Sequence, residues 1–134
     1  MVDVTKSAEC YDPSTRKWQS LPDMSVARNG CAAVSMEGVL YVVGGKSDLD
    51  TTLASAECYD PATRQWRALP AMSVARSDCA AECLEGCVYV VGGTNGSGSL
   101  LASAERYDPE TNAWSPLPSM PAPVALCSSA AVEM

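Results

Sequence analysis

The sequence repeats itself every 48 residues, and this period limits the possible folds more than any other feature. The three tryptophans, Trp18, Trp66 and Trp114, are each separated by 48 positions. When residues 7–54 are aligned with residues 55–102 without gaps, 29 of the 48 positions are identical. Such self-similarity is typical of repeat proteins, in which one supersecondary unit stacks on the next. The 134 residues therefore contain about 2.8 copies of one unit.

Within one unit the apolar residues follow the period of two that is typical of β-strands. Residues 31–36 and 39–43 form two short strands joined by a Glu-Gly turn, and a glycine pair ends the second strand. Two further strands are predicted over 55–59 and 65–69, joined by an Asp-Pro turn. Each unit is thus predicted to be one antiparallel four-stranded sheet. Sheets with two apolar faces are covered by stacking radially, as in a β-propeller.

Four short motifs recur in the same order: a glycine pair, Glu-x-Tyr-Asp-Pro, Thr-x-x-Trp and Leu-Pro-x-Met. Together they resemble kelch repeats, and the resemblance covers nearly the whole chain. It implies an all-β fold, namely a segment of a kelch-type β-propeller. The residues are Gly44, Gly45, Glu57, Tyr59, Asp60, Pro61, Thr63, Trp66, Leu69, Pro70 and Met72, then Gly92, Gly93, Glu105, Tyr107, Asp108, Pro109, Thr111, Trp114, Leu117, Pro118 and Met120.

The period also divides the chain, residues 1–134, as one incomplete propeller domain. We expect a partial blade at 1–24, complete four-stranded antiparallel blades at 25–72 and 73–120, and the first strand of a further blade at 121–134. Blades at the two ends would expose apolar faces that a full ring covers. Such faces favour self-association of the chain.

The composition argues against several classes of function. Acidic residues outnumber Lys and Arg by 16 to 9, whereas nucleic-acid binding needs clustered positive charge. No apolar run is long enough for a membrane helix, and the N-terminus lacks the pattern of a signal peptide. The chain has no histidine, the usual general base and the commonest metal ligand. We therefore expect no nucleic-acid or membrane partner, no catalytic residue, no cofactor and no metal site.

The seven cysteines are an odd number, so they cannot all pair within the chain. Most of them recur with the 48-residue period, as small buried apolar residues do. Cys83 and Cys87 flank a predicted turn, so a redox-active pair across that hairpin is an alternative to plain packing. Free thiols in this number favour a reducing compartment, and we expect a cytoplasmic location.

Two arginines are the main candidates for binding a partner. Arg28 and Arg76 recur in Met-Ser-Val-Ala-Arg, where one predicted blade leads into the next near the central channel. In the kelch adaptor proteins that the motifs resemble, arginines at this position hold acidic peptide motifs. The alternative is that each guanidinium pairs with an acidic neighbour or a strand-end carbonyl. Asn29 and Ser77, which follow the arginines, belong to the same candidate site.

The loop after each glycine pair is a second candidate surface. Residues 46–52 and 94–100 share none of their seven residues, although the sequence around them is nearly identical. Variable loops on a fixed scaffold commonly carry recognition, but divergence can equally mean an absence of constraint. Asp48 and Asn95 are the candidate contacts in these loops.

The leading hypothesis is a non-catalytic protein-interaction module whose partner is another protein, such as one with an acidic peptide motif. The resemblance implies two common settings: substrate recognition for a cullin-based ubiquitin ligase, and cytoskeletal or actin association. One alternative is a propeller enzyme, either an oxidase or a sugar-acting enzyme, although a copper oxidase needs histidine ligands. The other is a structural fragment with no partner of its own.

Overall fold

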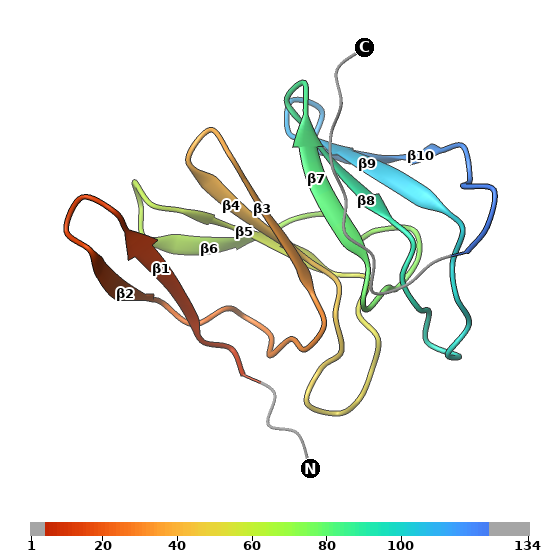
Figure 1. The fold of residues 1–134 in the computed structure, drawn as a ribbon, viewed down its shortest axis with the longest axis horizontal. Coiled ribbons are helices and arrows are strands. Elements are labelled where there is room, and N and C mark those ends of the chain that lie inside the picture. The colour runs from red at the N-terminus through yellow and green to blue at the C-terminus, as the bar shows by residue number, and fades with distance from the viewer. Residues whose placement is uncertain (1–4, 124–134) are drawn as a thin grey trace.

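The computed structural model describes residues 5–123, which contain ten β-strands in three antiparallel sheets (Figure 1). In each sheet the strands are neighbours in chain order, as the repeat pattern predicts. The predicted all-β fold with two four-stranded antiparallel sheets is confirmed. Sheet I consists of β1 (Ala8–Asp12) and β2 (Lys17–Leu21); sheet II of β3 (Ala32–Met36), β4 (Val39–Val43), β5 (Ala56–Asp60) and β6 (Gln65–Ala68); and sheet III of β7 (Ala80–Leu84), β8 (Cys87–Val91), β9 (Ala104–Asp108) and β10 (Ala113–Leu117).

Sheet I contains the counterparts of the third and fourth strands of the other two sheets, as predicted for the first partial blade. A further first strand is expected from the sequence over residues 121–134. Residues 124–134 of that segment lie outside the described residues.

Two-residue turns join the first and second strands of sheets II and III. Glu37 and Gly38 have φ angles of 52° and 79°, and Glu85 and Gly86 have 50° and 79°. Positive φ at both central residues gives a turn whose twist matches that of the flanking strands. The turns therefore fix the register in which Met36 pairs with Val39 and Leu84 pairs with Cys87.

The glycine pair at the end of β4 lies against the chain that enters sheet III. Gly44 and Gly45 have φ angles of 67° and 100°, a region that residues other than glycine adopt at an energetic cost. A Cβ at Gly44 would collide with the carbonyl oxygen of Arg76, which accepts a 2.7 Å hydrogen bond from the Gly45 N–H. Glycine is therefore required because two backbones meet here.

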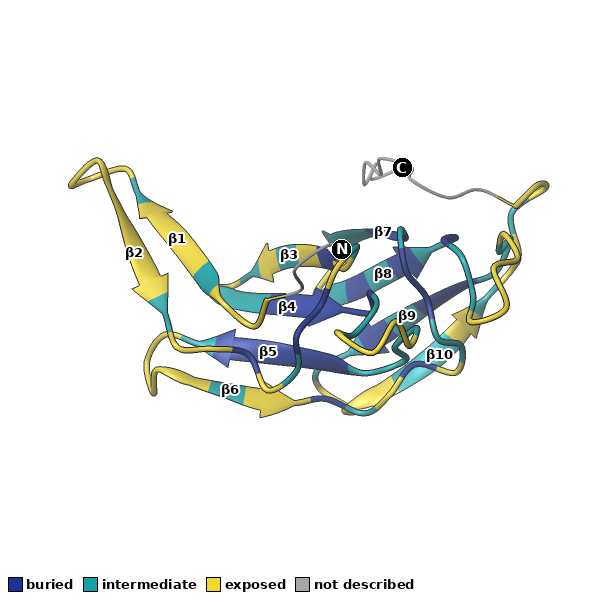
Figure 2. Ribbon diagram, turned by 90° about the horizontal axis from the view of Figure 1, so that it is seen from below, coloured by how far each residue is buried: buried dark blue, intermediate teal, exposed yellow. Residues whose placement is uncertain are grey.

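The main core lies between sheets II and III. Tyr41 and Val43 of β4 are buried in one cluster with Val88 and Val90 of β8 and Tyr107 of β9. The Tyr41 and Tyr107 ring centroids are 6.2 Å apart, and burying each large side chain contributes about 1.5 to 3 kcal/mol. Figure 2 shows the buried residues concentrated in β4, β5, β8 and β9. The other buried members of the cluster are Ala32, Ala56, Cys58, Leu69, Met72 and Cys79.

Candidate interaction surfaces

Arg28 does not lie on the surface, because its side chain is only 1% exposed. Nη1 donates to the carbonyl oxygens of Gly44 at 2.9 Å and Ser55 at 3.0 Å, and Nη2 donates to Oε2 of Glu57 at 3.1 Å. The backbone N–H of Ser25 donates to the other carboxylate oxygen of Glu57 at 3.0 Å. The arginine and the glutamate thus tie the segment before β3 to the facing ends of β4 and β5.

The same arrangement recurs 48 residues later around Arg76, whose side chain is also 1% exposed. Nη1 donates to the carbonyl oxygens of Gly92 and Ser103, both at 2.9 Å, and Nη2 lies 3.3 Å from Oε2 of Glu105. The Ser73 N–H donates to Oε1 of Glu105 at 2.9 Å. This repetition makes the pair a structural part of each blade.

These contacts do not support the hypothesis that Arg28 and Arg76 reach a partner from the surface. The structure adopts the alternative, in which each arginine pairs with a carboxylate and with strand-end carbonyls. A buried guanidinium must recover its lost hydration from fixed partners, and carbonyls and carboxylates supply them here. The sequence does hold a signal for this arrangement, since Arg28 and Glu57 are 29 residues apart and so are Arg76 and Glu105.

Asn29 and Ser77 anchor the variable loops through their backbones. The Asn29 and Lys46 backbones exchange two hydrogen bonds, of 2.9 and 2.7 Å, and Ser77 and Thr94 repeat the exchange at 3.0 and 2.8 Å. The Asn29 side chain is exposed, whereas Ser77 is 2% exposed and its Oγ has no hydrogen-bond partner in the structure. Of these two candidates, only Asn29 presents its side chain to solvent.

The first variable loop, residues 46–52, is a tight hairpin with an apolar tip. The Ser47 N–H donates to the Thr51 carbonyl oxygen at 2.9 Å, and the Asp50 N–H donates to the Ser47 carbonyl oxygen at 3.0 Å. Leu49 at the tip is 83% exposed, with Asp48 and Asp50 on either side. This loop thus offers a leucine flanked by two carboxylates.

The second variable loop, residues 94–100, has the same backbone bonds with different side chains. The Asn95 N–H donates to the Ser99 carbonyl oxygen at 2.9 Å, and the Gly98 N–H donates to the Asn95 carbonyl oxygen at 3.0 Å. Oδ1 of Asn95 accepts the N–H groups of Ser97 and Ser99, each at 3.0 Å, so this side chain braces its own loop. Both loops project from one edge of the sheets (Figure 1), and we call them, with Asn29, the loop edge.

The strand register does not support the alternative of a redox-active pair of Cys83 and Cys87 across the β7–β8 hairpin. Cys83 pairs in register with Val88, and Cys87 pairs with Leu84. Successive residues of a strand point to opposite faces, so the two thiols lie on different sides of sheet III. The thiols of Cys10, Cys31, Cys58, Cys83 and Cys87 are free, and burial raises the pKa of the Cys58 thiol.

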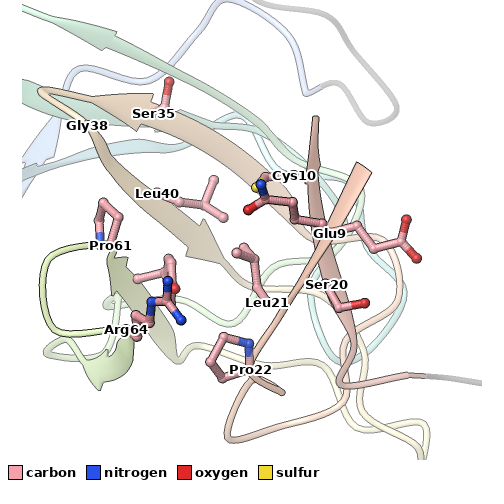
Figure 3. Close-up of a pocket in the computed structure, with 12 residues that line it drawn as sticks. Glu9, Cys10, Ser20, Leu21, Pro22, Ser35, Gly38, Leu40, Pro61 and Arg64 are labelled. Carbon is pink, nitrogen blue, oxygen red and sulfur yellow. The ribbon is translucent and has the colours of Figure 1, made fainter. Parts of the chain in front are cut away.

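A cleft of about 730 Å³ separates sheet I from sheet II (Figure 3). Its apolar lining includes Leu21 of β2 with Leu40 and Tyr59 of sheet II, and Glu9 and Arg64 contribute charged groups. In the junction between sheets II and III, side chains of β3 and β4 pack in the corresponding place. They are Val34, Met36, Val39 and Tyr41.

A smaller cleft of about 300 Å³ lies between the hairpin turns of sheets II and III, at the edge opposite the loop edge. Its charged lining is acidic and consists of Glu37, Glu85, Asp108 and Glu110.

Between residues 5 and 123, no three His, Cys, Asp or Glu side chains are grouped so that they could hold a metal ion. In the same region, no helix has the length and apolar character needed to cross a membrane.

The family comparison agrees with the repeat architecture. The family model described as Kelch motif matches residues 3–25, 27–73 and 75–121. The chain belongs to the kelch-repeat family. This confirms the resemblance inferred from the glycine pairs and the Tyr-Asp-Pro and Leu-Pro motifs.

Curated relatives of this kelch-repeat chain match it over single stretches. Kelch-like protein 23 of Homo sapiens is 44% identical over 43 residues, which are 32% of this chain and 8% of that protein. An F-box/kelch-repeat protein of Arabidopsis thaliana is 40% identical over 42 residues, 31% of this chain and 9% of that protein. Kelch repeat and BTB domain-containing protein 12 of Danio rerio is 46% identical over 35 residues, 26% of this chain and 6% of that protein. The matched stretches are thus small parts of longer proteins.

Among solved structures, the chain resembles YjhT with a TM-score of 0.72 and 17% sequence identity. The likeness covers 90% of this chain and 53% of that one. At this level of identity it shows the shared propeller-like fold and carries no information about function.

Proposed function

We propose that this kelch-repeat segment is a non-catalytic protein-interaction module that contacts its partner through the loop edge. The observation that carries the proposal is the pair of loops at residues 46–52 and 94–100. They have the same backbone hydrogen bonds and stand on nearly identical sheets, yet they share no residue. Exposed loops that vary on a rigid scaffold are suited to recognition.

The chemistry of the loop edge favours a partner with an apolar pocket bordered by basic groups. Leu49 is the most exposed large apolar side chain described, and Asp48 and Asp50 flank it. An apolar anchor within a charged rim is the usual anatomy of a binding surface. An acidic peptide motif, expected from Arg28 and Arg76, has less support because both guanidiniums are buried.

Of the two settings implied by the resemblance, we favour substrate recognition for a cullin-based ubiquitin ligase. BTB regions accompany kelch repeats in that setting, and a relative from Danio rerio is named for its kelch repeat and BTB domain. Actin association remains the alternative setting. We propose a cytoplasmic location for either one, because Cys10, Cys31, Cys58, Cys83 and Cys87 are free thiols.

Site-specific crosslinking tests the loop edge. A photo-crosslinking amino acid at position 49 should capture a protein partner, whereas the same group at position 85 should not, because Glu85 lies in an exposed turn at the opposite edge. The captured protein is then purified and its affinity for this chain is measured directly. Equal capture from both positions would contradict the proposal.

A loop exchange supplies the matched control. Replacing residues 46–52 by the sequence of 94–100 keeps a loop that this chain already folds into the same hairpin. We expect the affinity for the purified partner to fall about tenfold or more, since a central apolar anchor is lost. An unchanged affinity in a normally folded variant would show that the loop does not carry recognition.

A further inference from the structure

Each repeat presents a tyrosine–tryptophan pair on the face that looks toward the preceding sheet. The ring centroids are 5.3 Å apart in all three pairs. In sheets II and III the tryptophan Nε1 donates to a proline carbonyl oxygen of the preceding repeat, Trp66 to Pro22 and Trp114 to Pro70, both at 2.7 Å. The pair thus forms part of the junction between successive repeats.

The first pair has the same internal geometry, but within residues 5–123 no sheet lies in front of it. Tyr11 is 47% exposed and Trp18 is 68% exposed. Among the described residues, no carbonyl oxygen accepts a hydrogen bond from Trp18, unlike its two counterparts. This aromatic face therefore has the arrangement of a junction, and nothing in the described part of the chain opposes it. We call it the head face.

The opposing surface exists at the other end of the chain. Val88 and Tyr107 point toward sheet II, so the alternate residues of β8 and β9 point away from it. Tyr89, on this outer side, is the counterpart of Tyr41, which packs near Tyr107 in the internal junction. Pro118, the counterpart of Pro22 and Pro70, is exposed. We call this outer side of sheet III, with Leu117 and Pro118, the tail face.

The tail face also has an arginine, although this arginine lies on the third strand of its sheet and not on the fourth, as in sheet II. In sheet II, Cys58 of β5 pairs with Arg67 of β6, and the Arg67 guanidinium acts electrostatically on the Tyr107 phenol across the junction. In sheet III, Arg106 of β9 pairs with Ser115 of β10, so the arginine has moved to the neighbouring strand. The side of sheet II that faces sheet III and the tail face of sheet III therefore each offer a guanidinium where a tyrosine of the next repeat would lie.

We propose that two copies of this chain associate head to tail, with the Tyr11–Trp18 face of one copy packed on the outer side of sheet III of the other. Trp18 Nε1 donates to the Pro118 carbonyl oxygen of the second copy, and Arg106 lies beside Tyr11. The internal junction between sheets II and III is the template for this contact. Two different faces meet, so the association is heterologous, and the dimer keeps one head face and one tail face free for growth.

Light scattering over a concentration series tests the proposal. The average mass should rise above the 14.0 kDa of a single chain, and Trp18→Ala should hold it at that value. Gln65→Ala is the control, since Gln65 is an exposed residue of β6 in sheet II, outside both faces and the loop edge, and its loss should leave the mass unchanged. A chain that stays monomeric at high concentration would overturn the proposal.

Mixing two blocked variants distinguishes head-to-tail from symmetric contact. Trp18→Ala blocks only the head face, and Leu117→Glu blocks only the tail face, with Arg106→Glu as a second tail variant if Leu117→Glu folds poorly. Each variant alone should be monomeric, and an equimolar mixture should give dimers and nothing larger, because one intact junction remains. A mixture that stays monomeric would refute the head-to-tail arrangement, and so would association of both variants alone.

Discussion

At the scale of single residues, the arginine–glutamate pairs show what burial does to a charged side chain. The side chain of Arg76 is 1% exposed and that of Glu105 is 2% exposed, and the pair holds three segments of the blade together. A buried ion pair is costly to form, but it is costlier still to break on one side. The pairs are therefore parts of the scaffold whose integrity can be measured.

We expect Glu105→Gln to destabilise the protein by about 3 to 5 kcal/mol, because it leaves the buried Arg76 charge without its counterion. The double variant Arg76→Met with Glu105→Leu should lose less than the sum of the two single changes, since no buried charge remains. Denaturant unfolding midpoints provide the measurement. A loss below about 1 kcal/mol for Glu105→Gln would mean that the pair is not the anchor described here.

At this scale the sequence did not decide whether the two arginine side chains point to the surface or into the blade. It identified Arg28 and Arg76 as candidates, and the group that each binds could be a partner or an internal carboxylate. The spacing of 29 residues recurs for Arg28 with Glu57 and for Arg76 with Glu105, but it does not show that the pairs are buried. Sequence spacing gives the identity of repeated contacts, whereas the side on which a long side chain lies depends on the surrounding backbone.

At the scale of elements, the glycine pairs and two-residue turns fix how strands end and meet. Sequence patterns predicted these turns correctly, because positive φ at Gly38 and Gly86 is a local requirement. The register that follows from them decided the faces of Cys83 and Cys87, which the sequence interpretation left open. Local chemistry thus predicted the turn, and strand pairing decided the orientation.

Gly44→Ala should destabilise the protein by about 2 kcal/mol or more, because it combines a positive φ with a collision against the Arg76 carbonyl oxygen. Gly96→Ala is the control, since its added Cβ meets nothing within 4 Å. That change should stay within about 0.5 kcal/mol. Thermal unfolding of both variants decides the matter, and equal melting temperatures would argue against a tight backbone contact at Gly44.

At the scale of the whole molecule, the junction between sheets II and III buries groups that become charged in alkali. Burial raises the pKa of the Cys58 thiol and those of the Tyr41 and Tyr107 phenols. A raised pKa in the folded state means that these groups favour folding while they are protonated. The charged groups that act on them are Glu37, Glu57, Asp60, Arg67 and Asp108.

We therefore expect the free energy of unfolding to fall as pH rises above the ordinary values, about 8.5 for a thiol and about 10 for a phenol. Below those values the contribution is fully present, and it is lost as the pH rises through the higher folded-state values. The variant Cys58→Ala should weaken the part of this dependence that begins near the thiol value. Unfolding curves from about pH 7 to 11 measure it, and a stability that is flat across this range would contradict the expectation.

The sequence by itself determined the 48-residue period, the strands, the turns and the kelch-repeat architecture, because each depends on residues close together in the chain. Tertiary structure alone decided which of the repeated side chains are covered. Trp18 and Trp66 sit in nearly identical sequence and pack on their tyrosines at the same 5.3 Å, yet Trp18 is 68% exposed. The difference arises because a sheet buries its aromatic face only against a neighbour, and sheet I has none in front of it within the described residues.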